Sequence, residues 1–324
     1  MVVGTWIGDT APSPMSTFSR RAALQGLGAL GLGAVLPTAA HARPARRDPR
    51  TVSAHSFAVG EATVTVVRDA TFDLPLAALG TNVEPARVVA LLDEFGLPTT
   101  SAPTDVSQLV IDAGGVRTLV DTGTGGGRLV PTMRALGMEP ASVDRVVVSH
   151  FHGDHVGGVS ADGAPTFPGA SVHFPARELA FLEGYTPTGN AQADGGVQTA
   201  LGKLAPVRDR LQTYGDGDEL APGLAAVAAF GHTPGHMAFV LTSGEGRLMI
   251  ASDAANHPVV FFRQPSWLFG FDLDGDQTVR TRRRLLSRAA DERVPLFASH
   301  MPFPGVGRVS RDGVGFRFTP APVL

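Results

Sequence analysis

Residues 149–155 read Ser-His-Phe-His-Gly-Asp-His, and this stretch decides how the rest of the chain is interpreted. It follows residues 145–148, Arg-Val-Val-Val, an apolar run typical of a strand that is buried on both faces. In an extended chain, residues two apart point to the same side, so His150 and His152 are expected to face one pocket. Gly153 lets the backbone turn, and the Asp-His pair after it then presents an oxygen and a nitrogen close by. The spacing predicts a metal centre at the end of a buried strand.

Three further polar residues, His232, Asp253 and His300, each follow an apolar segment that we expect to form a strand. The expected strands cover residues 224–229, 248–251 and 295–298, respectively. Because α/β sheets gather working residues at the C-terminal ends of their strands, these three side chains are expected to join the first cluster. Any one of them alone is more often a core or turn residue than a ligand. Their repeated placement beside the first cluster favours the metal ligand.

Composition limits the chemistry that such a site performs. The chain has 324 residues, of which 43% are hydrophobic and 18% charged, a balance typical of a globular protein with a sizeable core. The net charge of −3 predicts no sequence-independent binding of nucleic acid. Cysteine is absent, so thiolate ligands and disulfides are excluded and any metal depends on His, Asp and Glu. The chain lacks the long apolar run of a membrane span, so no stable membrane insertion is expected.

The N-terminal segment has the order of an export signal. An arginine pair at residues 20–21 precedes a Gly/Ala/Leu-rich run that ends at Leu36, and the small residues Ala40 and Ala42 suit a signal peptidase. The segment resembles a twin-arginine signal, which would bring the protein to the twin-arginine export machinery and place it in the periplasm or outside the cell. The alternatives are an amphipathic helix or a disordered tail.

We therefore expect three parts: a signal peptide over residues 1–42, a lead-in segment over 43–61 and one domain over 62–324. The start is either Met1 or Met15. Strands are expected at residues 63–67, 109–111, 118–120, 145–148, 171–174, 224–229, 237–241, 248–251 and 295–298. Helices are expected at residues 129–136, 176–182, 197–211 and 278–291, with a further helix that opens at Val156. This alternation predicts an α/β domain.

Taken together, these motifs resemble the metallo-β-lactamase superfamily. The resemblance implies a four-layer αβ/βα sandwich with two mixed β-sheets, in which the metals lie between the sheets at one edge. It also implies the site residues: a first metal on His150, His152 and His232, a second on Asp154, His155 and His300, and Asp253 as the bridge. Asp121, in the turn Asp121-Thr122-Gly123, would support the ligands, and His236 would be a hydrogen-bond partner rather than a ligand.

Nitrogen and oxygen ligands without sulfur suit two divalent ions, of which Zn²⁺ is the first choice and Mn²⁺, Co²⁺ and Fe²⁺ are alternatives. Two such ions share a water and lower its pKa, so a metal-bridging hydroxide is expected to attack a carbonyl carbon or a phosphorus. Asp154 would help to move the proton, and Asp253 would fix the spacing of the metals. The expected activity is that of a metal-dependent hydrolase.

Within the superfamily, the absence of cysteine separates the chain from the commonest true β-lactamases. Residues 299–307 and 315–318 look most like methyl parathion hydrolase and its lactonase and arylesterase relatives, which implies a small apolar ester, lactone or phosphotriester as substrate. The alternatives are a glyoxalase II-like thioester hydrolase, an acyl-homoserine lactonase, an iron-dependent sulfur dioxygenase and, outside enzymes, a metal-binding pseudo-hydrolase. Lactonases of the family place a tyrosine near the metals, whereas Tyr185 and Tyr214 stand in no matching motif.

The other aromatic, histidine and arginine residues of note have a structural interpretation or two open ones. Phe261, Trp267 and Phe269 either line an apolar substrate pocket or pack in the core. His257 is expected on a surface loop, and His55 and His173 are expected to be structural. The arginines of the expected helix 278–291 are interpreted as a solvated face; they are Arg280, Arg282, Arg283 and Arg284. The expected partner is a small-molecule substrate, and the oligomeric state, with a dimer among the options, stays open.

Overall fold

The structure is a computed structural model, and it describes residues 53–321. Within these residues the chain forms two seven-stranded sheets and a two-stranded ribbon. The first sheet has the order β1 (Ala54–Val59), β2 (Ala62–Pro75), β3 (Ser101–Ala113), β4 (Val116–Val120), β5 (Arg145–Val147), β8 (Ser171–Pro175) and β9 (Leu211–Tyr214). The second sheet has the order β10 (Glu219–Ala221), β11 (Leu224–Ala228), β12 (Met237–Ser243), β13 (Gly246–Ile250), β14 (Leu296–Phe297), β15 (Val306–Asp312) and β16 (Gly315–Pro320). The ribbon pairs β6 (Ser160–Ala161) with β7 (Ala164–Pro165).

Both sheets are mixed. In the first, β1 to β4 are antiparallel neighbours, whereas β4, β5, β8 and β9 run parallel. In the second, only the β13–β14 pair is parallel. β5 is the strand that precedes the decisive stretch, and Val146 and Val147 are fully buried, as its continuous apolar character predicts.

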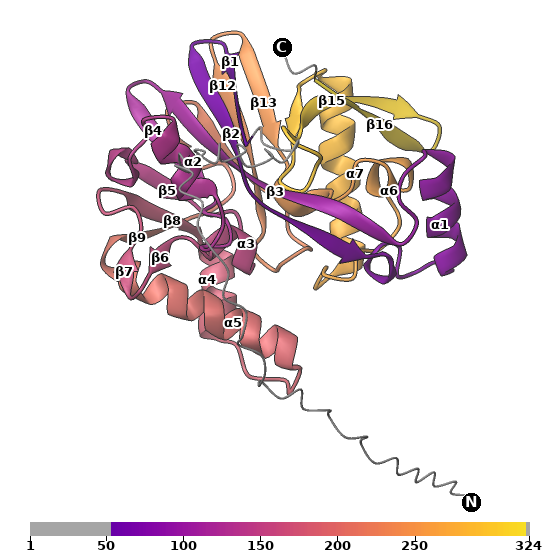
Figure 1. Cartoon of the computed structure of the whole chain (residues 1–324), viewed down its shortest axis with the longest axis horizontal. Helices are drawn as coiled ribbons and strands as arrows, with labels where there is room; N and C mark the ends of the chain where they lie inside the picture. The colour runs from indigo at the N-terminus through magenta and orange to yellow at the C-terminus, as the bar shows by residue number, and fades with distance from the viewer. Residues whose placement is uncertain (1–52, 322–324) are drawn as a thin grey trace, which may run out of the picture. The chain divides into compact units, whose positions relative to one another are not determined.

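Helices cover the outer faces of both sheets (Figure 1). The helices are α1 (Pro85–Glu94), α2 (Leu129–Ala135), α3 (Gly153–Val156), α4 (Ala176–Glu183), α5 (Ala191–Leu204), α6 (Val260–Arg263) and α7 (Gly275–Asp291), with short 3-10 turns η1 (Leu76–Ala78), η2 (Pro140–Ser142), η3 (Ala205–Arg210) and η4 (Ser252–Ala254). One core lies between α2, α4, α5 and the first sheet, a second between the two sheets, and a third between the second sheet and α7. This layering confirms the αβ/βα sandwich with two mixed sheets.

Helix α7 corrects one prediction. Asp274 caps it by accepting a hydrogen bond from Gln277 N, so the helix starts at Gly275, three residues before the expected start. Its buried side chains recur at helical spacing, and they include Arg282, which is 0% exposed. The interpretation of the arginines as a solvated face is therefore right for Arg280, Arg283 and Arg284 and wrong for Arg282.

Two other helices begin before their expected positions. Asn190 caps α5 by accepting bonds from Gln192 N and Ala193 N, and the helix ends at Leu204, just before Pro206. The glycines of its first turns, Gly195 and Gly196, weaken the helical pattern, so the start at Ala191 could not be predicted from the sequence. Helix α3 begins at Gly153 rather than at Val156, inside the decisive stretch itself.

The described domain also begins earlier than expected. β1 (Ala54–Val59) lies in the segment predicted as a lead-in and pairs with β2 along its whole length. The predicted signal peptide, residues 1–42, lies outside the described residues. In residues 53–321 no helix combines the length and the apolar character that crossing a bilayer requires.

Candidate metal centre

The decisive stretch is folded into a tight turn at the end of β5. His152 is extended, with φ −60° and ψ 148°, and its carbonyl accepts the first bonds of α3, from His155 N at 2.9 Å and Val156 N at 3.0 Å. Thr122, in the turn after β4, donates from its backbone to the carbonyl of His155 at 2.7 Å. The turn after β4 therefore holds the turn after β5 from behind, and both present their side chains at the same sheet edge.

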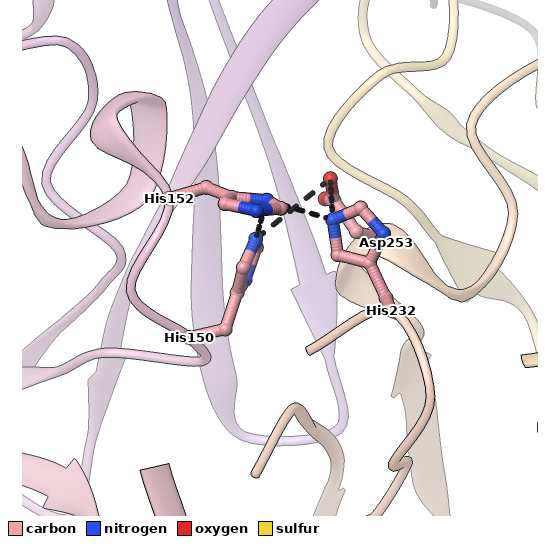
Figure 2. Close-up of side chains that lie close together, drawn as sticks. All are labelled: His150, His152, His232 and Asp253. Carbon is pink, nitrogen blue, oxygen red and sulfur yellow. Dashed lines mark hydrogen bonds and ion pairs between the residues drawn. The ribbon is translucent and has the colours of Figure 1, made fainter. Parts of the chain in front are cut away.

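Four side chains from the two sheets converge on one point (Figure 2). They are His150, His152, His232 and Asp253. His150 Nε2 lies 3.1 Å from His152 Nδ1, which lies 2.9 Å from His232 Nε2. One oxygen of Asp253, Oδ2, lies 3.3 Å from His232 Nε2. The first two follow β5 of the first sheet, whereas the others follow β11 and β13 of the second sheet.

A second group lies directly beside the first and contains Asp154, His155 and His300. His300 Nε2 is 3.3 Å from Asp154 Oδ2, and His155 Nε2 is 3.8 Å from the same oxygen. Asp253 stands between the groups, because its Oδ1 lies 3.2 Å from His155 Nε2 and its Oδ2 lies 3.3 Å from His232 Nε2 and 3.1 Å from His300 Nε2. The structure thus brings together all seven residues that the sequence pointed to, in the two expected sets, with Asp253 shared.

The outward-facing nitrogen of four of these imidazoles is occupied by a protein acceptor. His155 Nδ1 donates to Asp121 at 2.8 Å, His232 Nδ1 to Asp272 at 2.9 Å, and His300 Nδ1 to the Asp105 carbonyl at 3.0 Å. His150 Nδ1 donates to Ser149 Oγ at 2.9 Å, whose own proton goes to Asp121. With Nδ1 carrying the proton, the Nε2 lone pair of each ring points into the cluster, which is the arrangement a metal ligand needs.

This donor set fits a pair of divalent cations. Inside the cluster, His155 Nε2 and Asp253 Oδ1 are buried and have no hydrogen-bond partner. When the rings are neutral and His150 and His232 keep their protons on Nδ1, only His152 can place a proton among the three nitrogens that meet at about 3 Å, so at least two lone pairs point into the same space. Nitrogen and carboxylate ligands without sulfur suit Zn²⁺ and its neighbours. The residues that face inward therefore lack partners that a bound cation would provide.

The electrostatics of the protein alone separate the histidines into two kinds. Burial, and after it the neighbouring His155, hold the pKa of His150 well below its usual range. Burial and then His232 do the same to the pKa of His152. Burial also lowers the pKa of His232, but Asp253 and Asp272 outweigh it and raise that pKa to about 9. The carboxylates thus stabilise positive charge on one side of the cluster.

The second group is likewise dominated by carboxylates. Burial lowers the pKa of His155, yet Asp253 and Asp121 outweigh it and raise that pKa well above its usual range. For His300, too, the charge of Asp253 overcomes burial and raises the pKa. Burial raises the pKa of Asp253, but His300 and His155 outweigh it and hold that pKa well below its usual range. Asp253 is therefore ionised and attracts positive charge from both groups.

Asp121 and His236 both contact this cluster from behind. Asp121 Oδ1 accepts from Ser149 N at 2.7 Å and its Oδ2 from Ser149 Oγ at 2.8 Å, in addition to His155. Its φ of 61° places it in the left-handed region, which turns the chain so that both oxygens point back at the β5 turn. His236 accepts from Asp253 N at 3.1 Å and donates to the Ala229 carbonyl at 2.8 Å, so it is not among the converging donors.

Three residues that support the cluster were not predicted from the sequence. Glu178 of α4, which is fully buried, accepts from Phe151 N at 3.0 Å and from Gly235 N at 2.6 Å and so ties the His150–His152 loop to the His232 loop. A Cβ at Gly235 would lie 2.3 Å from Glu178 N, so this approach requires glycine. Asn256 donates to Asp253 Oδ2 at 3.0 Å, and Asp272 supports His232. Lone acidic or amide residues outside a motif give no sequence signal.

A cavity of about 890 Å³ opens over the cluster. Its floor includes His152, Asp154, His232, Asp253 and His300. Its walls are mainly apolar and contain Phe72, Leu74, Phe151, Phe181, Val197, Phe269, Phe271 and Leu273. Asp154 has the most exposed side chain of the acidic residues in the cluster, at 25% against 4% for Asp253.

The aromatic residues proposed for the pocket separate into two classes. Phe269 lines the cavity and stacks on His232, with ring centroids 6.2 Å apart. Phe261 and Trp267 do not line it, because they are buried in a core with α1 and α6, so their assignment to the pocket is wrong. Tyr185 lines the cavity, with its hydroxyl donating to Asp194 at 2.8 Å, whereas Tyr214 is buried and donates to the Val148 carbonyl.

The remaining histidines lie outside the cluster. His257, expected on a surface loop, is instead buried, and its Nδ1 accepts from Val259 N and Val260 N. His257 thus accepts from the first residue of the short helix α6 instead of facing the solvent, which corrects the prediction. His55 stacks on Phe57 in β1, and His173 in β8 contacts Ser171 Oγ at 3.0 Å.

Comparisons with known proteins agree with this geometry. The family model described as "Metallo-beta-lactamase superfamily" matches residues 102–300. An N-acyl homoserine lactonase, AttM of Azorhizobium caulinodans, is 30% identical over 182 residues, which are 53% of this chain and 64% of the lactonase. The chain thus aligns with less than two thirds of the length of that relative.

Two solved structures share the fold. One is AidC, a dizinc quorum-quenching lactonase in complex with a product, with a TM-score of 0.80, 23% identity, and coverage of 84% of this chain and 98% of that one. The other is AbOPH, a hydrolase in the beta lactamase superfamily, with a TM-score of 0.77, 24% identity, and coverage of 83% and 98%. At these identities the likeness is one of fold.

Proposed function

The chain belongs to the metallo-beta-lactamase superfamily, and from that premise we propose that it is a dinuclear metal-dependent hydrolase of small, uncharged esters and lactones. One observation carries the proposal: two groups of donors share Asp253 at the floor of a mainly apolar cavity. The first metal would be held by His150, His152 and His232, and the second by Asp154, His155 and His300, with Asp253 between them.

Two divalent ions, Zn²⁺ being the first choice for these ligands, would supply Lewis acidity that polarises a carbonyl group and lowers the pKa of water. The residues of the chain do the rest. The carboxylate of Asp253 fixes the distance between the two donor groups because it lies within 3.3 Å of imidazole nitrogens of both. Asp154 is the more exposed of the two acids among these donors, so its carboxylate would take the proton of the attacking water and pass it to the departing alkoxide as the acyl C–O bond breaks.

The cavity selects against charged substrates. Among the described residues that line it there is no Arg, Lys or Glu, and its acidic members all lie at the floor beside the histidines. A glutathione thioester carries carboxylates that need basic partners for recognition. This lining therefore disfavours the glyoxalase II-like alternative and favours an uncharged ester or lactone with an apolar substituent.

A second candidate is hydrolysis of N-acyl homoserine lactones in particular. Tyr185 lines the cavity although no sequence motif marks it, and lactonase AttM is among the matched relatives. The apolar walls would take the acyl chain. A phosphotriester fits the same lining, and the experiment below separates it from the carbonyl substrates.

The test is turnover by the metal-loaded protein of four substrates: a p-nitrophenyl carboxylic ester, an N-acyl homoserine lactone, a dialkyl p-nitrophenyl phosphate and S-lactoylglutathione. We expect activity on the first two, loss of it with a chelator, and about two metal ions per chain by elemental analysis. His152→Ala should lose metal and at least about a hundredfold in rate. His55→Ala, in β1 and outside the cluster, is the matched control. Full turnover by the metal-free protein, or an unchanged His152→Ala variant, would refute the proposal.

We also propose that residues 1–42 act as a twin-arginine export signal. The support is the order of the arginine pair at 20–21, the Gly/Ala/Leu-rich run and the small residues before position 43. Replacing both arginines by lysine should keep the protein in the cytoplasm of a bacterial host, whereas the unaltered chain should reach the periplasm with its N-terminus at residue 43. Export of the lysine variant at the original level would contradict the assignment.

A further inference from the structure

Arg282 is a charged residue without a role in the function proposed above. It lies on the inner face of α7 and is 0% exposed, while Arg283 beside it is exposed. Burial lowers the pKa of Arg282 only to about 10, so the guanidinium keeps its charge at neutral pH. A buried charge is costly unless it is paired and hydrogen-bonded, so its partners indicate why it is there.

Five groups surround this guanidinium. Its Nε donates to the Ala254 carbonyl at 2.9 Å, and its Nη1 donates to the carbonyls of Pro265 at 3.2 Å and Trp267 at 2.8 Å. Its Nη2 lies 3.6 Å from Asp272 Oδ2. The guanidinium also stacks 4.4 Å above the ring of Phe261. All of these partners belong to segments that follow Asp253 in the chain.

Each partner is linked to the metal centre or to the cavity. Asp272 is a buried carboxylate whose other oxygen, Oδ1, accepts from His232 Nδ1 at 2.9 Å. Ala254 belongs to the turn η4 that carries Asp253. The carbonyls of Pro265 and Trp267 fix the segment that leads into Phe269, a wall of the cavity. One side chain thus contacts the support of a histidine, the turn of the shared carboxylate and the cavity wall.

We propose that Arg282 is a positioning residue that holds His232, Asp253 and the Phe269 wall in one fixed arrangement. It acts on His232 through Asp272, since the guanidinium provides the counter-charge that keeps this carboxylate in place behind the imidazole. It acts on Asp253 and on the wall through the backbone carbonyls. The inference rests on the proposed metal centre and assigns a role that neither the ligand set nor the cavity lining includes.

The planar guanidinium is what makes this arrangement possible. It donates in several directions of one plane at once, while its faces stay free to stack on Phe261. A lysine at position 282 would keep a positive charge, but its single ammonium group could not contact Asp272 and the three carbonyls together. Arg282→Lys therefore tests the whole planar set of contacts, including the one to Asp272, and Asp272→Asn tests the path to His232 while leaving the contacts to the backbone in place.

Three measurements apply to Arg282→Lys and Asp272→Asn, with Arg283→Lys as the matched control on the exposed face of α7. The first is exchange of the His232 ring N–H in the metal-free protein, by NMR with labelled histidine, the signal being assigned by its loss in His232→Gln. The second is the rate at which bound Co²⁺ passes to a chelator, together with its visible spectrum. The third is the kcat and KM of the loaded enzyme on a p-nitrophenyl ester.

We expect at least tenfold faster ring-proton exchange and at least tenfold faster Co²⁺ loss in both variants, and no change in the control. Because Arg282, unlike the Asp272 carboxylate, contacts the carbonyls of the segment before Phe269, Arg282→Lys should lower kcat and raise KM, whereas Asp272→Asn should act mainly on kcat. In the double variant, the rates of ring-proton exchange and of Co²⁺ loss should stay within twofold of those in Arg282→Lys, since both changes act along one path.

Folded variants whose exchange and Co²⁺ loss stay within twofold of the unaltered chain would overturn the inference, as would effects that multiply in the double variant. If Arg282→Lys does not fold, an unchanged His232 signal in Asp272→Asn is sufficient to reject the path. Ring-proton exchange is read on the metal-free chain and needs no turnover. If the protein hydrolyses none of the four substrates, the proposed function is refuted. The exchange measurement still tests the role of Arg282 in that case.

Discussion

Replacing Asp121 by asparagine isolates the contribution of one buried carboxylate to the metal centre. Its oxygens accept from Ser149 N and Ser149 Oγ, and from His155 Nδ1, at 2.7 to 2.8 Å. Asparagine has nearly the same shape and tolerates the left-handed backbone at this position, where φ is 61°. The substitution therefore changes charge and hydrogen bonding without adding backbone strain.

The expected loss follows from the hydrogen bonds. The amide oxygen of asparagine still accepts from Ser149 N, whereas its amide N–H₂ faces the two donors that the second oxygen of Asp121 accepted from. A hydrogen bond to a charged group contributes about 1.5–3 kcal/mol, and part of the loss is offset because a buried charge disappears. We expect the free energy of unfolding to fall by about 3 kcal/mol, which lowers the Tm by about 6–12 °C for a domain of this size.

The site should respond as well, because His155 loses the acceptor that keeps its proton on Nδ1. Once the proton moves to Nε2, that nitrogen has no lone pair for the second metal. Urea unfolding of the metal-free protein and metal content after dialysis measure the two effects. Glu139→Gln, which breaks an exposed ion pair with Arg134, is the control and should cost less than about 1 kcal/mol. A loss below about 1 kcal/mol in Asp121→Asn, with two metals retained, would refute this reasoning.

The remaining predictions use the core, the cavity, the pH and the metal. Trp267→Ala should lower the free energy of unfolding by about 3–5 kcal/mol because Trp267 is buried. Phe271→Ala at the cavity rim should lower it by under about 1 kcal/mol and raise KM for apolar esters. Equal stabilities of the two variants by urea unfolding would contradict this. Burial lowers the pKa of His257 to about 4, below that of the unfolded chain, so its stabilising contribution is present above pH 6.5 and is lost as the pH falls toward 4. His257→Asn should remove about 2 kcal/mol of the difference in unfolding free energy between pH 8 and pH 5, and an unchanged pH slope would count against it. Removing the metal with a chelator should lower the Tm, because free metal at a thousand times its Kd stabilises the folded state by about 4 kcal/mol; a Tm independent of metal would contradict a site formed only in the folded chain.

The convergence of the cluster could be predicted because each member follows an apolar strand. His232, Asp253 and His300 lie up to 150 residues from the first histidine, yet each stands where a strand of the second sheet ends. Strand ends meet at one sheet edge whatever the length of the connections between them. The packing of the sheets, which is what places these ends opposite β5, follows from the apolar faces and not from the motif itself.

The supporting residues could not be predicted, because their roles depend on tertiary contacts alone. Arg282 stands among three exposed arginines, so charge patterning assigns it to the solvent, and only the docking of α7 shows that it is buried. Asp272 and Glu178 belong to no motif, and each becomes informative only through its partner across the site. The choice between pocket and core for Trp267 stayed open for a related reason, since an aromatic residue near a site packs in the core as readily as it lines a cavity.

Both donor groups draw on both sheets, with His150, His152, Asp154 and His155 from the first and His232, Asp253 and His300 from the second. An ion bound by either group thus links the two sheets of the sandwich directly. The complete cage exists only once the sheets have docked, so metal capture reports the last stage of folding. Unfolding of the metal-loaded protein has to break these metal–ligand bonds before the two sheets separate. The folded state should therefore live much longer than it would with a metal held by ligands of one sheet only.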